Sequence, residues 1–240
     1  MRIRYFGAQY QHSGYAAAAH DYLSALIINK ADVNSRPLVQ ADPEWVARAG
    51  RYAPLLEFAN REDDTGPEWP THVIAHSIPY GCTIFVTEEL TPPPGVKRVA
   101  ISTWETSELP NRATQPLEDL FDLVLVPSEY CREAFTKRGV LSKEKVKVLP
   151  HTFDPSWWFR YKEAAQAPGT YTFYSILTWC QRKDPIGLLK AYLTEFTQED
   201  DVLLKIKTPQ HDLHEVNEMV EGLKLDPDKL PPVEIICDRY

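Results

Sequence analysis

The sequence has no long uninterrupted apolar run. Its longest apolar stretch, residues 16–28, contains His20, Asp21 and Ser24 and is too short to span a bilayer, so we expect no membrane-spanning segment. The N-terminus leads directly into a strand-like stretch, without the apolar segment and small-residue cleavage site of a signal peptide. The expected location is therefore the cytoplasm.

Cysteine and positive charge are also scarce. The 240 residues include four cysteines, spaced roughly fifty positions apart, which fits neither a disulfide framework nor a paired metal motif. We expect them to be buried thiols. Lysine and arginine number 26 against 34 acidic residues, a net charge of -8. This balance disfavours bulk binding of nucleic acid or anionic lipid, which relies on clustered cations.

Apolar runs of strand length alternate with helical patterns along the chain. This alternation is typical of successive βα units around a mainly parallel sheet, so the predicted class is α/β. The expected strands are 2–6, 72–75, 96–102, 123–126, 146–149, 171–177, 202–207 and 233–237. The expected helices are 14–29, 117–120, 129–137, 185–196 and 213–223.

A linker-like stretch at 163–170 divides this pattern into two parts. We predict an N-terminal Rossmann-like domain at 1–165 and a partial second domain at 171–240. The second part holds only strand, helix, strand, helix and strand. Either this second domain is very small, or we expect the sequence to be the N-terminal portion of a longer protein.

Candidate site residues follow the expected strands, where ligands collect in doubly wound sheets. Gly14 lies at the helix start after the first strand, where backbone N–H groups suit a phosphate or a sugar hydroxyl; a simple turn glycine is the alternative. His76 lies where the strand at 72–75 should end, and it either lines a cleft or is merely hydrogen-bonded. The zinc-binding HExxH pattern needs a helix and a glutamate. His72 and His76 lie on a strand with no glutamate between them, so we expect no metal.

Further candidates come from three later strand ends. Trp104 and Glu105 could stack on and hydrogen-bond a hydroxylated substrate, although Glu105 could equally be exposed beside a helix cap. His151 lies in a loop after its strand. Arg182 and Lys183 precede an expected helix, where side-chain charge and helix dipole favour the same anion; a pair of exposed charges is the alternative.

Taken in order, these segments resemble family 4 retaining glycosyltransferases of the GT-B architecture, in the branch with a Trp-Glu signature. The matching pieces are the first loop ending at Gly14, Thr-Trp-Glu-Thr with Leu-Pro at 103–110, 122–128, Gly-Val at 139–140, 148–154, and 174–183. Together they cover nearly the whole chain.

The resemblance implies transfer of a sugar from a nucleotide-diphosphate sugar to a carbohydrate or other hydroxyl acceptor. It implies a donor site with Gly14, His151, Arg182 and Lys183, and an acceptor side with His76 and Glu105 as catalytic residues and Trp104 as a substrate contact. It further implies no metal and no cofactor beyond the donor substrate, and a front-face mechanism without a nucleophilic carboxylate.

Two departures from the family pattern leave alternatives open. Leu177 stands where the family usually has an arginine, and the family's Glu-x7-Glu motif has no counterpart in these residues. The alternatives are a non-catalytic carbohydrate- or nucleotide-binding module, half of a split enzyme whose C-terminal domain a second chain completes, and an unrelated nucleotide-binding α/β protein.

Overall fold

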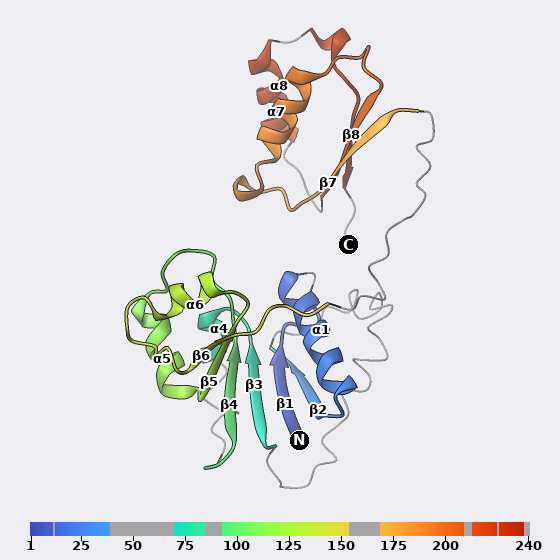
Figure 1. Cartoon of the computed structure of the whole chain (residues 1–240). Coiled ribbons are helices and arrows are strands. Elements are labelled where there is room, and N and C mark those ends of the chain that lie inside the picture. The colour runs from blue at the N-terminus through green and yellow to red at the C-terminus, as the bar shows by residue number, and fades with distance from the viewer. Residues whose placement is uncertain are drawn as a thin grey trace. The chain divides into compact units, whose positions relative to one another are not determined.

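The computed structural model describes residues 1–11, 13–38, 70–84, 93–153, 169–208, 213–224 and 226–237. The chain divides into two compact units, Met1–Phe159 and Arg160–Tyr240 (Figure 1). From the sequence, this division was expected slightly later, between residues 165 and 171. Of the expected linker at 163–170, residues 163–168 lie outside the described residues. Both units are α/β with parallel strands, which confirms the predicted class.

The first unit is built on a six-stranded parallel sheet in the order β2-β1-β3-β4-β5-β6. The strands are β1 (Arg2–Gly7), β2 (Asp32–Pro37), β3 (His72–His76), β4 (Lys97–Ile101), β5 (Leu123–Val126) and β6 (Val146–Val148). The helices are α1 (Gly14–Ile28), α4 (Pro79–Ile84), α5 (Asn111–Leu120) and α6 (Glu129–Thr136). Because every pair is parallel, the carboxyl ends of all six strands lie at one edge of the sheet.

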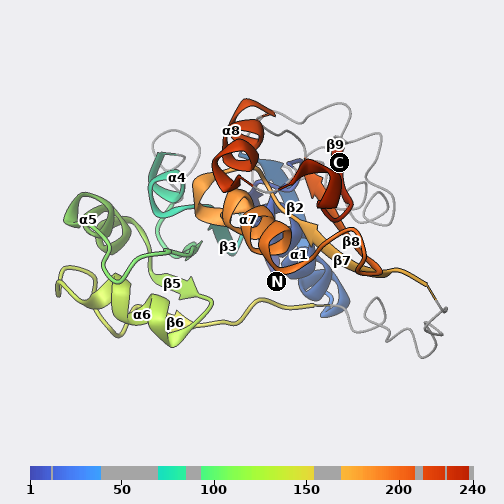
Figure 2. The same cartoon turned by 90° about the horizontal axis from the view of Figure 1, so that it is seen from above.

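Helices cover both faces of this sheet, α1 on one side and α4, α5 and α6 on the other (Figure 2). Alternate residues of β1 show the two layers. Tyr5 packs in the same buried cluster as Leu23 of α1, whereas Phe6 packs with Leu117 of α5 and Phe135 of α6. Burial on both faces explains why most of these strands read as continuous apolar runs.

Three elements of the first unit differ from the sequence expectation. β2 was not predicted, because its residues Asp-Val-Asn-Ser-Arg-Pro are mostly polar. Among the described strands it lies at the edge of the sheet and pairs with β1. α4 was also missed. α5 begins at Asn111, earlier than the expected range 117–120. The expected range was too short because Pro116, which lies inside the helix, interrupts the helical pattern of the sequence.

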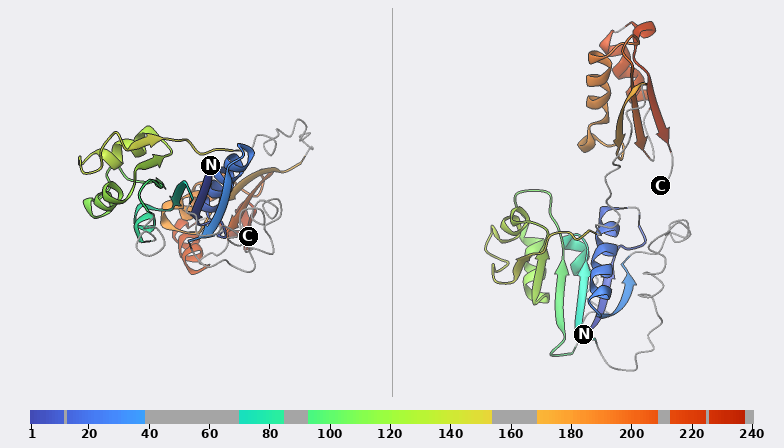
Figure 3. Two further views of the ribbon diagram at one scale, coloured as in Figure 1. Left: turned by 90° about the horizontal axis from the view of Figure 1, so that it is seen from below. Right: turned by 45° about the vertical axis from the view of Figure 1, so that its right-hand side comes forward.

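The second unit has a three-stranded parallel sheet in the order β7-β8-β9. Its elements are β7 (Tyr171–Ile176), the 3-10 turn η3 (Gln181–Lys183), α7 (Pro185–Glu195), β8 (Val202–Thr208), α8 (Leu213–Leu223), η4 (Pro227–Lys229) and β9 (Val233–Cys237). α7 and α8 lie on the same side of the sheet (Figure 3). Leu189 and Leu193 of α7 share a buried cluster with Leu204 and Ile206 of β8.

The cysteines follow the expectation only in part. All four are free thiols; Cys82 and Cys131 are buried, but Cys180 is half-buried and Cys237 is exposed. The expectation of burial was wrong for Cys237, the last residue of β9, which is exposed. In the part of the chain that the structure describes, no helix is long and apolar enough to cross a membrane.

Candidate functional site

The carboxyl edge of the first unit's sheet brings several predicted residues together. His76 is the last residue of β3, Trp104 and Glu105 follow β4, and His151 follows β6. Gly14 begins α1, the helix that follows β1. The parallel topology therefore places five of the seven predicted site residues at one edge, as expected for a doubly wound sheet.

His76 is 2% exposed and lies among three tyrosine rings. Its ring centroid is 6.0 Å from that of Tyr5 in β1, and 5.5 Å from those of both Tyr15 and Tyr22 in α1. The Tyr5 hydroxyl lies 2.6 Å from His76 Nδ1. We call Tyr5, Tyr15, Tyr22, His76 and His151 the histidine cluster. The three tyrosine rings pack around the imidazole.

Burial controls the protonation of this cluster. Desolvation lowers the pKa of His76 to about 3, and the neighbouring His151 acts in the same direction. Desolvation likewise raises the pKa of Tyr5 well above its usual value, and Tyr22 and Cys82 add to this effect. Both Tyr5 and His76 are therefore neutral at physiological pH, so His76 offers hydrogen bonds and no positive charge.

Tyr22 connects His76 to His151. Its ring packs edge-on against His76, while its hydroxyl lies 3.3 Å from His151 Nδ1. The same hydroxyl is 3.3 Å from the carbonyl oxygen of Leu149 and 3.4 Å from that of Pro150. His151 itself is exposed. Two histidines that the sequence predicted independently thus belong to one cluster, joined by a tyrosine that sequence reasoning missed.

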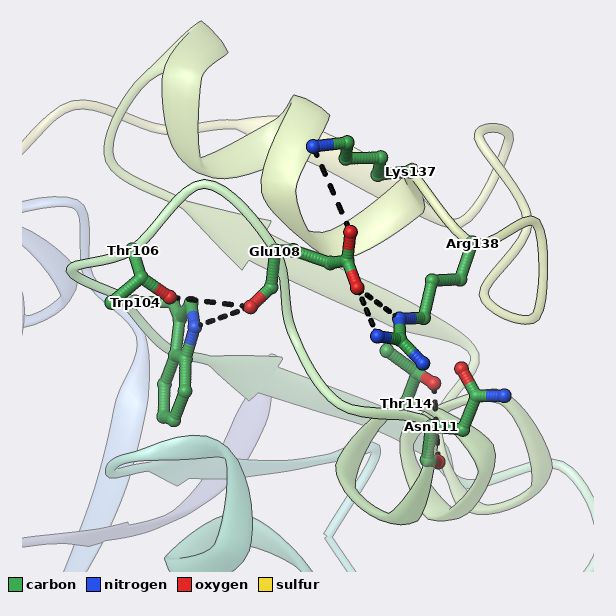
Figure 4. Close-up of polar contacts among 7 residues, drawn as sticks. All are labelled: Trp104, Thr106, Glu108, Asn111, Thr114, Lys137 and Arg138. Carbon is green, nitrogen blue, oxygen red and sulfur yellow. Dashed lines mark hydrogen bonds and ion pairs between the residues drawn. The ribbon is translucent and has the colours of Figure 1, made fainter.

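Trp104 anchors the loop after β4 (Figure 4). Its indole N–H donates to the carbonyl of Glu108 over 2.9 Å, and the Thr106 hydroxyl donates to the same oxygen over 3.2 Å. The indole packs edge-on against Tyr80 of α4, with centroids 6.4 Å apart. These contacts give Trp104 a packing role in the loop; its stacking on a substrate stays a prediction.

The two acidic residues of this loop have different surroundings. Glu108 forms ion pairs with Arg138 and with Lys137, the latter at 3.7 Å. The hydrogen bond from Arg138, helped by Lys137, holds the pKa of Glu108 below its usual range. Glu105 is exposed, and its negative charge adds to burial in raising the pKa of Tyr15. Glu105 therefore lies close enough to the histidine cluster to act electrostatically on it.

The start of α1 is open at Gly14. Ser13 caps the helix, since its hydroxyl accepts from the N–H of Ala16 over 3.2 Å. A Cβ built at Gly14 would meet nothing within 4 Å, so the backbone is approachable from outside. Gly7 differs, because a Cβ there would come within 2.7 Å of the Tyr5 ring. Gly7 is thus required for packing beneath the cluster, whereas Gly14 leaves room for a ligand.

Gln9 is a buried polar residue that the sequence reading did not single out. It is 0% exposed, and its Nε2 donates to the Ser35 hydroxyl over 2.7 Å. Its Oε1 has no hydrogen-bond donor among the described residues. A buried acceptor of this kind is costly unless something donates to it. Its place directly after β1, in the first βα turn, was the signal that could have identified it.

The second unit carries the predicted cationic pair. Arg182 and Lys183 lie in η3 and are exposed. The following residue, Asp184, has a left-handed backbone with φ 49°, and its carboxylate accepts from the N–H of Gly187 over 3.1 Å. Asp184 thus caps α7. Its carboxylate occupies one of the backbone N–H groups at the helix N-terminus that were expected to bind an anion. The two cations remain on the surface beside it.

Comparisons of the sequence with protein-family models and with curated proteins found no match. Comparison of the fold with solved structures did. The S. aureus MnaA–UDP complex is 11% identical, with a TM-score of 0.52, over 98% of this chain and 69% of that one. An alpha-glucosyltransferase in complex with UDP and a mismatched 13-mer DNA is 11% identical, with a TM-score of 0.55, over 99% and 67%.

A third similar structure is the N-terminal domain of Candida albicans trehalose-6-phosphate phosphatase. It is 11% identical, with a TM-score of 0.54, over 100% of this chain and 72% of that one. At these identities the likeness concerns the fold alone. The chain has the GT-B type of α/β fold, with a Rossmann-like first unit and a shorter second unit of the same kind. This confirms the predicted fold class.

Proposed function

We propose that this protein is a family 4 retaining glycosyltransferase, of the branch with the Trp-Glu signature, that transfers a sugar from a nucleotide-diphosphate sugar to a hydroxyl acceptor. The observation that carries the proposal is the fold, which over 98–99% of the chain is similar to two structures that hold UDP. The order of the sequence motifs supports it. The acceptor is proposed to be a carbohydrate or another hydroxyl compound, and the location to be the cytoplasm.

In the proposed reaction the second unit holds the donor diphosphate. Departure of a nucleoside diphosphate builds up negative charge, which cations stabilise most where that charge develops. The exposed Arg182 and Lys183 supply two positive charges on adjacent positions of η3. We assign them to the diphosphate, without a metal ion. Asp184 fixes the turn that presents them.

In the first unit the carboxyl edge of the sheet serves the transferred sugar and the acceptor. His76 is neutral and offers hydrogen bonds, and Glu105 offers an exposed carboxylate that can accept a proton from the attacking hydroxyl. Gly14 lets a ligand approach the start of α1, and His151 adds a second imidazole beside Tyr22. In the front-face mechanism no carboxylate attacks the sugar.

The test is a panel of nucleotide diphosphates and nucleotide sugars, measured by thermal shift and by product formation. Binding to the native state raises the apparent stability by mass action, so a base-selective shift is expected. Lys183→Ala should weaken diphosphate binding by ~1.5–3 kcal/mol, the value of a lost charged hydrogen bond. Lys190→Ala is the matched control, because Lys190 is also exposed and lies on α7.

Glu105→Gln separates the two substrates. It is expected to leave the nucleotide-induced shift unchanged while transfer to the acceptor falls, because the amide cannot accept the proton. Loss of nucleotide binding in this variant would place Glu105 with the donor instead. Unchanged transfer would remove it from the reaction.

A second candidate is a binding module, or half of a split enzyme that another chain completes. The chain covers 67–72% of the length of the similar structures. This candidate predicts nucleotide or carbohydrate binding without turnover by the isolated chain. Formation of a glycosylated product by the isolated chain excludes it.

A further inference from the structure

The hydrogen bond between Tyr5 and His76 determines which imidazole nitrogen carries the proton. A neutral imidazole has one N–H and one bare nitrogen, and its hydrogen bonds select between them. Tyr5 Oη lies 2.6 Å from His76 Nδ1, and both side chains are at most 2% exposed. Either Tyr5 donates to a bare Nδ1, or a protonated Nδ1 donates to Tyr5.

The hydroxyl proton of Tyr5 decides between these two arrangements. Burial raises the pKa of Tyr5, so the hydroxyl keeps its proton and needs an acceptor. In the part of the chain that the structure describes, the hydrogen-bond partner of this hydroxyl is His76 Nδ1. Tyr5 is therefore the donor, Nδ1 is the acceptor, and the imidazole proton resides on Nε2.

We propose that Tyr5 is a positioning residue that fixes the Nε2–H tautomer of His76, so that His76 is a hydrogen-bond donor at the carboxyl end of β3. Nε2 lies across the ring from Nδ1, so its N–H is directed away from Tyr5. The inference rests on the proposed glycosyl transfer in one respect. There, this N–H donates to an oxygen of the transferred sugar rather than removing a proton.

The other two tyrosines do not compete for Nδ1. Tyr15 packs against the imidazole, but its hydroxyl donates to the carbonyl of Thr103 over 3.5 Å. Tyr22 also packs against it, but its hydroxyl is directed to His151 and to the carbonyls of Leu149 and Pro150. Each ring thus contributes to burial, and Tyr5 alone among the three hydrogen-bonds His76.

This difference supplies a matched pair of variants. Tyr5→Phe removes the hydroxyl that holds Nδ1 and keeps the ring. Tyr22→Phe removes a hydroxyl from the same cluster and leaves the contact between Tyr5 and His76 in place. Nitrogen-15 NMR of the histidine side chains in the full chain distinguishes the two tautomers directly. The signals that disappear in His76→Gln identify His76.

The expected result for the unmodified chain is a bare Nδ1 and a protonated Nε2, unchanged between about pH 5 and 8. Tyr22→Phe should give the same pattern. Tyr5→Phe should show both tautomers, or the opposite one. A protonated Nδ1 in the unmodified chain overturns the proposal without any variant, and so does a tautomer pattern that Tyr5→Phe leaves unchanged.

Kinetics provides a second measurement. If His76 donates in the transition state, Tyr5→Phe lowers kcat about tenfold, with little change in KM for the donor. The two proposals fail separately. The expected NMR pattern with no glycosyl transfer contradicts the proposed function and supports the tautomer assignment. Transfer at full rate in a Tyr5→Phe variant with mixed tautomers overturns the positioning role.

Discussion

β1 and β7 are the first strands of the two units, and their surroundings differ. Each has tyrosine as its fourth residue. Tyr5 of β1 is 0% exposed, because β1 lies between β2 and β3 and both faces of its sheet are covered. Tyr174 of β7 is 58% exposed, because among the described residues β7 is an edge strand and the helices cover the other face of its sheet. Neighbouring layers, rather than strand sequence, decide the environment of the side chain.

The chemistry of the two units differs accordingly. The first unit buries His76, whose Nδ1 is hydrogen-bonded to Tyr5 in low dielectric and whose imidazole stays neutral. The second unit presents exposed cations, Arg182 and Lys183, whose attraction to an anion is screened by salt. On the open face of its sheet, Ile176 is as exposed as Tyr174. We therefore expect the first unit to orient a bound ligand by hydrogen bonds, and the second unit to attract an anion by its positive charge.

The largest effect is expected from truncation within the covered face of the second unit. Ile206 of β8 is 0% exposed, so Ile206→Ala should cost about 2–5 kcal/mol of unfolding free energy. Ile176→Ala on the open face should cost less than ~0.5 kcal/mol. Hydrogen exchange of the β8 amides measures both, because it reports the opening of this unit rather than of the whole chain. Similar losses in the two variants would contradict the one-sided packing.

The next effect is the pH dependence that buried His76 gives to the first unit. Its pKa is about 3 in the folded chain, below the ordinary value of 6.5, so the unfolded chain binds the proton more readily. This contribution to stability is complete above pH 6.5 and falls by up to about 1.4 kcal/mol per pH unit as the pH drops towards 3. His76→Gln should flatten this slope in denaturant titrations between about pH 6.5 and 4.5.

The surroundings of His76 define the control for that measurement. Tyr5, Tyr15 and Tyr22 face it and have raised pKa values, so none of them ionises in this range. His151 faces it through Tyr22, so the comparison is repeated in a His151→Asn background. An equally steep slope in the unmodified chain and in the His76→Gln variant would mean that other groups cause the acid sensitivity.

The sequence predicted the elements whose pattern is local. Eight of the nine described strands lay in apolar runs, and the helix α7 was expected at 185–196, where Ile186, Leu189, Leu193 and Phe196 recur at helical spacing. β2 was missed because an edge strand buries little; only alternate residues such as Val33 and Ser35 are covered. The parallel order then placed the five candidate residues of the first unit at one edge of its sheet.

Contacts between distant residues were not predictable in this way. Tyr5 and His76 are 71 positions apart in the sequence. Their place in apolar strands indicates that both side chains are buried, but not that the tyrosine hydroxyl contacts Nδ1 of the histidine. Likewise, the sequence placed cations before α7, but not the carboxylate of Asp184 on the amide of Gly187. Side-chain rotamers and the approach of separate elements fix such contacts, and both depend on packing of the whole unit.

A smaller effect compares the helix caps of the two units. Asp184→Ala removes the cap of α7 and places alanine at φ 49°, so a cost of about 1–2 kcal/mol is expected. Asp184→Asn keeps a capping oxygen and tolerates the left-handed backbone, so its cost should stay below ~0.5 kcal/mol. Ser13→Ala in the first unit loses a cap at an extended φ of -148° and should cost about 1 kcal/mol.

The order of these expected costs is checked by thermal denaturation and by hydrogen exchange of the amides in each unit. Asp184→Ala should affect only the second unit, and Ser13→Ala only the first. Equal costs for Asp184→Ala and Asp184→Asn would show that the carboxylate charge, rather than the cap and backbone, stabilises the turn. Because Asn also removes a negative charge beside Lys183, this variant should bind a nucleotide diphosphate at least as tightly as the unmodified chain.

The smallest effect is expected at Tyr174, and it tests the comparison with Tyr5 directly. Tyr174→Thr keeps a residue that favours strands and removes a ring that is 58% exposed, so stability should change by less than ~0.5 kcal/mol. The measurement is hydrogen exchange of the β7 and β8 amides at several protein concentrations. A large loss that grows as concentration rises would mean that a second copy covers this face in solution, and the contrast between β1 and β7 would then belong to the isolated chain alone.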